Sequence, residues 1–80
     1  PPISGNYVSS RGAEVTEGVE RDSTKVTDLY EGRAVHVVEV VTRDDLRRVR
    51  GRIDMPVAGW ISLQNMDDGS KCKWVRPGLV

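Results

Sequence analysis

The stretch RRVRGRIDMPVAGWISL, residues 47–63, decides the fold of this chain. Arginines fill four of its first six positions, and the stretch then becomes apolar around a tryptophan. Side chains of a β-strand point alternately to its two faces, so Arg48, Arg50 and Arg52 share one face and the residues between them share the other. Pro56 then interrupts the ladder because proline has no N–H to donate. The stretch therefore predicts two consecutive strands, the first with an arginine face and an apolar face.

Similar short alternations, rich in β-branched residues and separated by turn signals at spacings of about 8–12 residues, recur along the chain. Helical periodicity is nearly absent. We expect strands at residues 13–17, 25–30, 33–42, 47–55, 59–65 and 70–75. The pair Asp68 and Gly69 is a hairpin signal, because both residues can take the positive φ of a tight turn. The pattern predicts an all-β domain of five or six antiparallel strands over residues 13–75, with an N-terminal extension at 1–12 and a C-terminal tail at 76–80.

A turn at Asp44 and Asp45 joins two of these strands in a hairpin. A symmetric loop would pair Val40 with Val49, Val38 with Gly51 and His36 with Ile53 on one face, and Val41 with Arg48, Glu39 with Arg50 and Val37 with Arg52 on the other. A slip of the register would change these partners but would leave the three arginines on one face. Glu39 is expected to meet Arg50 or Arg52.

The strand at 33–42 is apolar on both sides under this alternation. Val35, Val37 and Val41 would lie on one face, and Val38 and Val40 on the other. A sheet in so small a domain has one interior face, so the second face must be covered by arginine stems, by residues 1–12 or by a partner. This strand therefore predicts an interaction surface beside the arginines.

Composition favours one small globular domain over a disordered tail, because 38% of the 80 residues are apolar and 30% are charged. The formal net charge is zero. Residues 13–45 carry nine acidic and four basic residues (−5), residues 46–80 carry three and seven (+4), and Arg11 supplies the remaining charge. The two halves could face partners of opposite sign, or strands lying side by side could neutralise them.

The sequence lacks the features that are typical of several classes of protein. No run approaches the roughly 18 apolar residues of a membrane span. Cys72 is the single cysteine, so no internal disulfide forms and an intracellular location is favoured. A chain that does not begin with Met is expected to be a processed protein or a domain of a longer one. One histidine, His36, predicts no metal site, and no nucleophile with a base or pair of working carboxylates is assembled. We expect that the protein is not an enzyme and that it binds no cofactor.

The segments AEVTEGVERDSTKVTDLYEGRAVHVVEV (13–40) and RVRGRIDMPVAGWISL (48–63) resemble an SH3-like barrel, and the resemblance is closest to the bacterial-type SH3 repeat. The matching positions are Ala13 and Val15, the loop from Gly18 to Thr24, Leu29 with Gly32, Val35 with Val37, and Gly59, Trp60, Ile61 and Ser62. The resemblance implies a small SH3-like β-barrel. Eukaryotic SH3 domains bind proline-rich peptides on a shelf of aromatic side chains. Their Ala-Leu-Tyr-Asp-Tyr stretch and paired tryptophans are missing here.

We therefore expect a noncatalytic protein-interaction or assembly module, acting as an accessory domain or a small subunit. A protein partner with an acidic or apolar surface would contact Val35, Val37, Arg48, Arg50, Arg52, Pro56 and Trp60. Trp60 is expected to cap one end of the core, half-buried, and Trp74 to behave similarly. One alternative is a nucleic-acid-binding barrel that uses Arg47–Arg52 with Lys71 and Lys73, against which the zero net charge stands. Another is binding of proline-rich peptides by Tyr30, Pro56 and the tryptophans.

Overall fold

A computed structural model describes residues 4–66 and 73–78 of the chain, and these form seven strands and no helix. The strands are β1 (Gly5–Ser9), β2 (Ala13–Thr16), β3 (Lys25–Leu29), β4 (Ala34–Arg43), β5 (Arg48–Met55), β6 (Gly59–Asn65) and β7 (Val75–Pro77). Five of the six expected strands therefore lie within about one residue of their expected bounds. The all-β class is confirmed.

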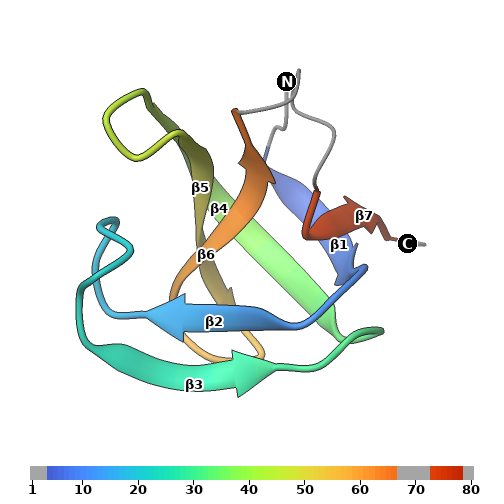
Figure 1. The fold of residues 1–80 in the computed structure, drawn as a ribbon. Helices are drawn as coiled ribbons and strands as arrows, with labels where there is room; N and C mark the ends of the chain where they lie inside the picture. Colours follow the sequence, from blue (N-terminus) through green and yellow to red (C-terminus); the bar gives the residue numbers. More distant parts are fainter. Residues whose placement is uncertain (1–3, 67–72, 79–80) are drawn as a thin grey trace.

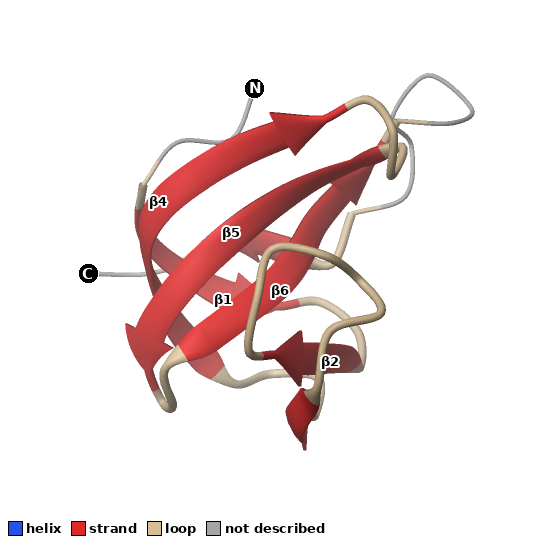
Figure 2. Ribbon diagram, turned by 90° about the vertical axis from the view of Figure 1, so that its left-hand side faces the viewer, coloured by secondary structure: helices blue, strands red, loops and turns tan. Residues whose placement is uncertain are grey.

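All seven strands belong to one antiparallel sheet in the order β3-β2-β6-β5-β4-β1-β7. The sheet is strongly bent, so that β2 and β3 run across one end of β4, β5 and β6 (Figure 1). The three central strands curve side by side along their whole length (Figure 2). β3 and β7 are the two edges, and within residues 4–66 and 73–78 no pairing joins them. The sheet is therefore open, and the closed barrel expected from the sequence is not seen.

The extra strand, β1, lies within residues 1–12, which the sequence predicted to be an N-terminal extension. β1 pairs with β4 on one side and with β7 on the other. The count of five or six strands was wrong because β1 is short and polar, and only its two partners turn it into a strand. The last expected strand, 70–75, is also revised: Lys73 bridges to Gln64, whereas Val75–Pro77 pairs with β1. The expected turn at Asp68 and Gly69 lies outside the described residues.

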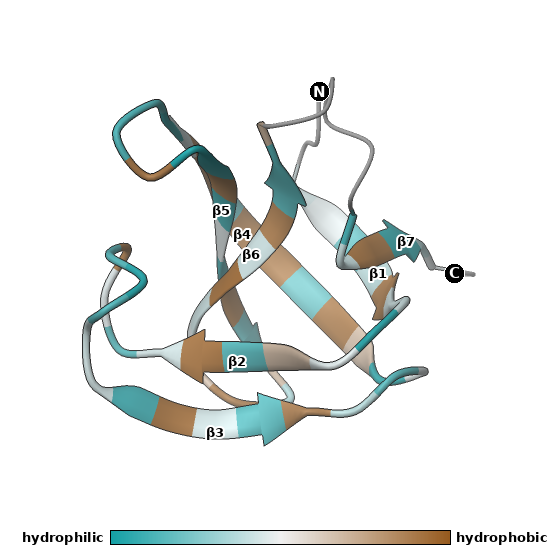
Figure 3. Ribbon diagram, in the orientation of Figure 1, coloured by the Kyte–Doolittle hydropathy of each residue, from teal (hydrophilic) through white to brown (hydrophobic). Residues whose placement is uncertain are grey.

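A single hydrophobic core fills the concave side of the bent sheet. Its buried members are Ala13, Val15, Leu29, Val35, Val37, Val49, Ile53, Ile61, Leu63 and Val75. They come from every strand except β1, so the core depends on contacts between distant parts of the chain. Hydrophobic residues are spread over the strands, whereas the loop at 17–24 is mostly hydrophilic (Figure 3).

A β-bulge in β4 explains why this strand is apolar on both sides. Val37 pairs with Ile53 and Glu39 pairs with Arg52, which leaves Val38 as the extra residue. A bulge reverses the alternation beyond it. Val35 and Val37 are 1% and 0% exposed, and Val40 packs against the same core. The expectation that Val40 lies opposite the other two was wrong, because it assumed unbroken alternation.

The hairpin between β4 and β5 is displaced by two residues from the symmetric register. Its loop spans residues 44–47, with Arg47 at a φ of 54° and its N–H bonded to the Asp44 carbonyl at 3.2 Å. Val41 consequently pairs with Arg50, and Glu39 with Arg52. A displacement of two preserves the faces of β5, because the side-chain period of a strand is two residues. Val49 and Ile53 accordingly enter the core, as the sequence predicted.

Candidate functional site

A pocket of about 230 Å³ opens along one edge of β6. β5 occupies the other edge of β6 along its length. On the pocket side, Thr16 of β2 pairs with Trp60, and Lys73 bridges to Gln64. The pocket lies between these two attachments, beside Ser62. It therefore exists because β2 and the segment at 73–74 diverge along the same edge.

Arg50 forms the inner part of this pocket. Its side chain leaves β5 on the face opposite the core, yet Arg50 is only 2% exposed. The guanidinium group donates from Nη2 to Thr16 Oγ1 at 2.6 Å, from Nη1 to Ser62 Oγ at 3.0 Å and from Nε to the Val19 carbonyl at 3.0 Å. All three acceptors are neutral. Among the described residues, no carboxylate forms an ion pair with Arg50.

The charges around Arg50 leave its buried guanidinium in a net positive surrounding. Burial lowers the pKa of Arg50 to about 10, and the positive charges of Arg21 and Arg48 lower it further. Glu14 and Glu20 raise the pKa, each by less than either arginine lowers it. At neutral pH the side chain remains protonated. Two arginines and two glutamates among the described residues therefore act on this buried cation, and the arginines have the larger effect.

Trp74 forms one wall of the pocket and contacts two further arginines. The guanidinium carbon of Arg48 lies 4.9 Å from the centre of the Trp74 ring, and that of Arg11 lies 5.6 Å away. A cation at this distance is attracted to the electron-rich face of the indole. The Trp74 backbone N–H is bonded to the Leu63 carbonyl at 2.9 Å, which fixes the residue against β6. Trp74 thus helps to position Arg48 at the mouth of the pocket.

The loop at 17–24 covers Arg50 and brings Arg21 to the pocket. Ser23 Oγ ties the loop together by accepting from the Gly18 N–H at 3.1 Å and donating to the Glu20 carbonyl at 2.6 Å. Arg43 reaches the same loop through Glu20 at 3.1 Å. The loop is therefore held to the sheet from both β4 and β5, and its arginine is delivered to a defined place.

The residues predicted to contact a partner divide into three groups. Val35 and Val37 are core residues, so their assignment to a partner surface was wrong: the bulge at Val38 leaves both facing inward. Arg48 and Arg50 line the pocket. The remaining three, Arg52, Pro56 and Trp60, lie near one another at the far end of the β5–β6 face, where Pro56 is exposed and Trp60 is half-buried.

The far end of this face differs from the pocket in its charge pairing. Arg52 is exposed and donates to Glu39 at 2.9 Å, one of the two partners expected from the sequence. Trp60 pairs with Arg52 and borders a second, more open hollow with Glu17 and Val26. Trp60 has the half-buried character that was predicted, but it lies beside Arg52 instead of joining the residues packed on the core.

Sequence reasoning missed Arg21, Glu14 and Thr16, and it identified Ser62 only as part of a motif. Arg21 sits in a polar loop, where nothing local distinguishes it from other charged residues. The sequence does contain an arginine in a predicted strand, Arg50, and a long polar loop, 17–24, that could cover it. Only the fold shows that the two meet.

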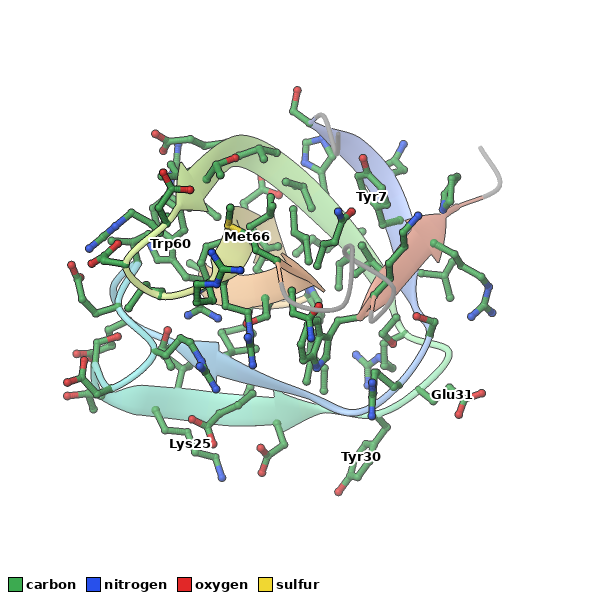
Figure 4. All side chains as sticks on the ribbon, turned by 45° about the horizontal axis from the view of Figure 1, so that its top comes forward. Tyr7, Lys25, Tyr30, Glu31, Trp60 and Met66 are labelled. Carbon is green, nitrogen blue, oxygen red and sulfur yellow. The ribbon has the colours of Figure 1, made fainter. Side chains whose placement is uncertain are left out.

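Tyr30 and Trp60 do not form one aromatic shelf. Tyr30 is 76% exposed and extends away from the body of the fold, on a different side from Trp60 (Figure 4). A polyproline-binding surface needs neighbouring aromatic side chains. This arrangement gives little support to the proline-rich peptide alternative.

Within the described part of the chain, no cluster of three or more histidine, cysteine or acidic side chains could hold a metal ion. His36 Nδ1 lies 2.8 Å from Asp54 Oδ1, as a single pair. No helix among the same residues has the length and apolar character needed to cross a membrane.

Comparisons with protein-family models, curated proteins and solved structures found no match to this chain. The geometry of the pocket and its surroundings is therefore what indicates a function.

Proposed function

We propose that this chain is a noncatalytic, SH3-like protein-interaction or assembly module, acting as an accessory domain or a small subunit, and that its partner places an acidic group in the arginine pocket. The observation that carries the proposal is Arg50, a buried cation bonded only to neutral oxygens. The pocket replaces the valine surface as the centre of the expected interface.

The SH3-like part of the proposal is supported by the succession of elements. A first strand with Ala13 and Val15 leads through a polar loop into β3, then into the long valine strand β4, the hairpin and the Gly-Trp strand β6. This is the order found in the family that the sequence resembles. The open edges at β3 and β7 differ from a closed barrel, so the likeness rests on the order of strands and on the bent sheet.

An acidic partner is supported by the energetics of buried charge. Removing a cation from water is costly unless an anion or several hydrogen bonds compensate it. Arg50 donates three hydrogen bonds to neutral oxygens, and two neighbouring arginines add repulsion. A carboxylate or similar group from a partner would supply the missing negative charge. Arginine suits this role because its planar donors bind oxyanions at two points.

The surroundings of the pocket suit a protein partner. The pairs Arg50 with Ser62 and Arg52 with Trp60 follow each other on one face, roughly 7 Å apart at the usual rise of a strand. A partner segment with its acidic group in the pocket would therefore reach Trp60 and Pro56 within a few residues. Aromatic and arginine side chains are the types enriched in protein interfaces.

The nucleic-acid alternative receives less support from this arrangement. Arg47 donates to the Met66 carbonyl at 3.3 Å, and Arg50 is buried, so these residues do not present an open basic stripe along β5. Binding of a phosphodiester backbone uses many exposed cations at once. The net charge of zero also argues against nucleic-acid binding.

Peptide arrays test the proposal directly. Degenerate peptides centred on Asp or Glu should bind the chain, and Arg21→Gln or Arg50→Lys should weaken binding about tenfold, the loss expected for one charge-assisted bidentate contact. Arg33→Gln removes an exposed arginine from the turn before β4 and serves as the matched control. If no acidic peptide binds in a manner that depends on Arg21 or Arg50, the proposal is wrong.

A further inference from the structure

We propose that the anion accepted by this pocket is a phosphoryl group, carried by a phosphorylated side chain of the protein partner, in preference to the carboxylate of Asp or Glu. This inference rests on the proposed function and adds the chemical class of the ligand. It depends on three features of the pocket: the charges around Arg50, the N–H donors of Arg50 that form no hydrogen bond within the described residues, and the origin of the arginines in separate segments of the chain.

The charges that act on Arg50 favour a dianion over a monoanion. The described residues that line the pocket include three arginines and one glutamate. A phosphorylated side chain carries about −1.5 to −2 at pH 7, whereas a carboxylate carries −1. The pKa of Arg50 points to the same excess, because Arg21 and Arg48 outweigh Glu14 and Glu20 at the guanidinium group. A dianion therefore offsets more of this positive excess at Arg50 than a carboxylate does.

Arg50 retains donors for such a ligand. A guanidinium group has five N–H donors, and three of those of Arg50 are engaged, which leaves two, one on each Nη nitrogen. Two donors on one planar group can bind two oxygens of the same phosphoryl group. The engaged donors fix the plane of the guanidinium, so the ligand meets an oriented group and little rotational freedom is lost on binding.

The other arginines approach from different directions. Arg21 comes from the loop at 17–24, and Arg48 comes from the start of β5, where it stacks near Trp74. Arg21 is exposed and forms no ion pair among the described residues, so it can close over a ligand. A phosphoryl group presents three terminal oxygens in three directions, which donors from separate elements can reach together.

An NMR titration distinguishes the two kinds of anion. The probes are N-acetyl-phosphoserine amide, N-acetyl-phosphotyrosine amide, N-acetyl-glutamate amide, inorganic phosphate and a short single-stranded oligonucleotide. The readouts are the Arg50 Nε–H signal and the Trp74 indole signal. We expect a phosphoamino acid amide to bind at least about tenfold more tightly than the glutamate amide, because the phosphoryl group carries nearly twice the charge.

Lowering the pH gives an independent readout. The second pKa of a phosphoryl group is about 6, so its charge falls from about −2 towards −1 between pH 7.5 and pH 5, while a glutamate carboxylate with a pKa of about 4.3 stays mostly ionised. Phosphoserine binding should therefore weaken severalfold at pH 5, and glutamate binding should change little. Arg21→Gln and Arg50→Lys should each weaken phosphoserine binding about tenfold. Arg33→Gln should not.

The outcomes separate the inference from the proposed function. Equal binding of glutamate and phosphoserine, both dependent on Arg21, would overturn the phosphoryl inference and leave the acidic-partner function standing. Inorganic phosphate binding as tightly as the phosphoamino acid amides would overturn the assignment to a phosphorylated side chain. Oligonucleotide binding that depends on Arg50 and falls steeply with salt would overturn both. Because Arg21 is exposed, its variant tests the site even if the Arg50 variant destabilises the fold.

Discussion

The two ends of the β5–β6 face carry the same residue types and behave differently. At one end Arg50 is buried and bonded to hydroxyl and carbonyl oxygens, and at the other end Arg52 is exposed and paired with Glu39. The two arginines leave the same strand on the same side. What separates them is their coverage: the Val19 carbonyl of the loop at 17–24 accepts a hydrogen bond from Arg50, whereas Arg52 is bonded to Glu39 of β4. Coverage by a distant segment, and not local sequence, turns one arginine into a pocket residue and leaves the other as part of a solvated ion pair.

The largest expected effect comes from a cavity in the hydrophobic core beneath both ends of the β5–β6 face. Ile61 is fully buried under this face, between its Trp60 and Ser62 neighbours. Ile61→Ala should lower the free energy of unfolding by about 2–5 kcal/mol, because it removes buried methyl groups and leaves a cavity. Urea denaturation would measure the change. Gln64→Ala, a half-buried change on the same strand, should cost much less, and equal losses would contradict this description of the core.

Gly59→Ala tests the close contact between β2 and β6 at the Trp60 end of the face. A Cβ atom at Gly59 would overlap Val15 Cγ1 and would lie 2.9 Å from the Thr16 carbonyl oxygen, so β2 would have to move away from β6. We expect a loss of about 1–3 kcal/mol in unfolding free energy, as for other overpacked sites. Gly32→Ala meets nothing within 4 Å but has a φ of 87°, so it reports backbone strain alone. A fully neutral Gly59→Ala, measured by thermal unfolding, would show that the approach of β2 to β6 is loose.

Arg50→Met tests whether the buried arginine serves binding or stability. Removing one partner of a buried ion pair is strongly destabilising because the other charge stays uncompensated, but Arg50 forms no ion pair among the described residues. We therefore expect the unfolding free energy to stay within about 1 kcal/mol of the parent chain, because the relief of burying a cation offsets the lost hydrogen bonds. Binding of the phosphoserine amide should disappear. A loss above about 2 kcal/mol in urea denaturation would instead make Arg50 mainly an anchor of the loop at 17–24.

Arg52→Gln should have the smallest effect. Its ion pair with Glu39 joins two side chains that are each about half exposed, at 48% and 49%. Exposed pairs contribute about 0.2–1 kcal/mol and are screened by salt. Thermal unfolding at low and high salt should show a small difference that narrows as salt increases. A loss as large as that of Ile61→Ala would mean that the two ends of the face do not differ as described.

The sequence located most of the strands because their signal is local. Alternation in β5 and the turn residues around it placed Arg48, Arg50 and Arg52 on the face opposite Val49 and Ile53, and the structure agrees. β1 was missed because its five residues, GNYVS, have little apolar alternation of their own. They form a strand only between β4 and β7.

The prediction that Val35 and Val37 of β4 contact a partner was wrong for a different reason. One extra residue at Val38 reverses the faces of β4, and a bulge depends on how the partner strand pairs, which the sequence of β4 does not contain. Of the seven residues predicted to contact a partner, Arg48 and Arg50 line the pocket and Val35 and Val37 belong to the core. The remaining three lie at the Trp60 end, where their role in binding stays a prediction.

The sequence by itself determined that this chain is β-rich and that three arginines share one face of a strand, because side-chain alternation is a property of the backbone. The tertiary structure alone decided which arginine is buried, which valines reach the core and where a pocket opens. Burial and coverage depend on segments far apart in the chain, such as the loop at 17–24 and β5, and their meeting is fixed only when the whole sheet has formed.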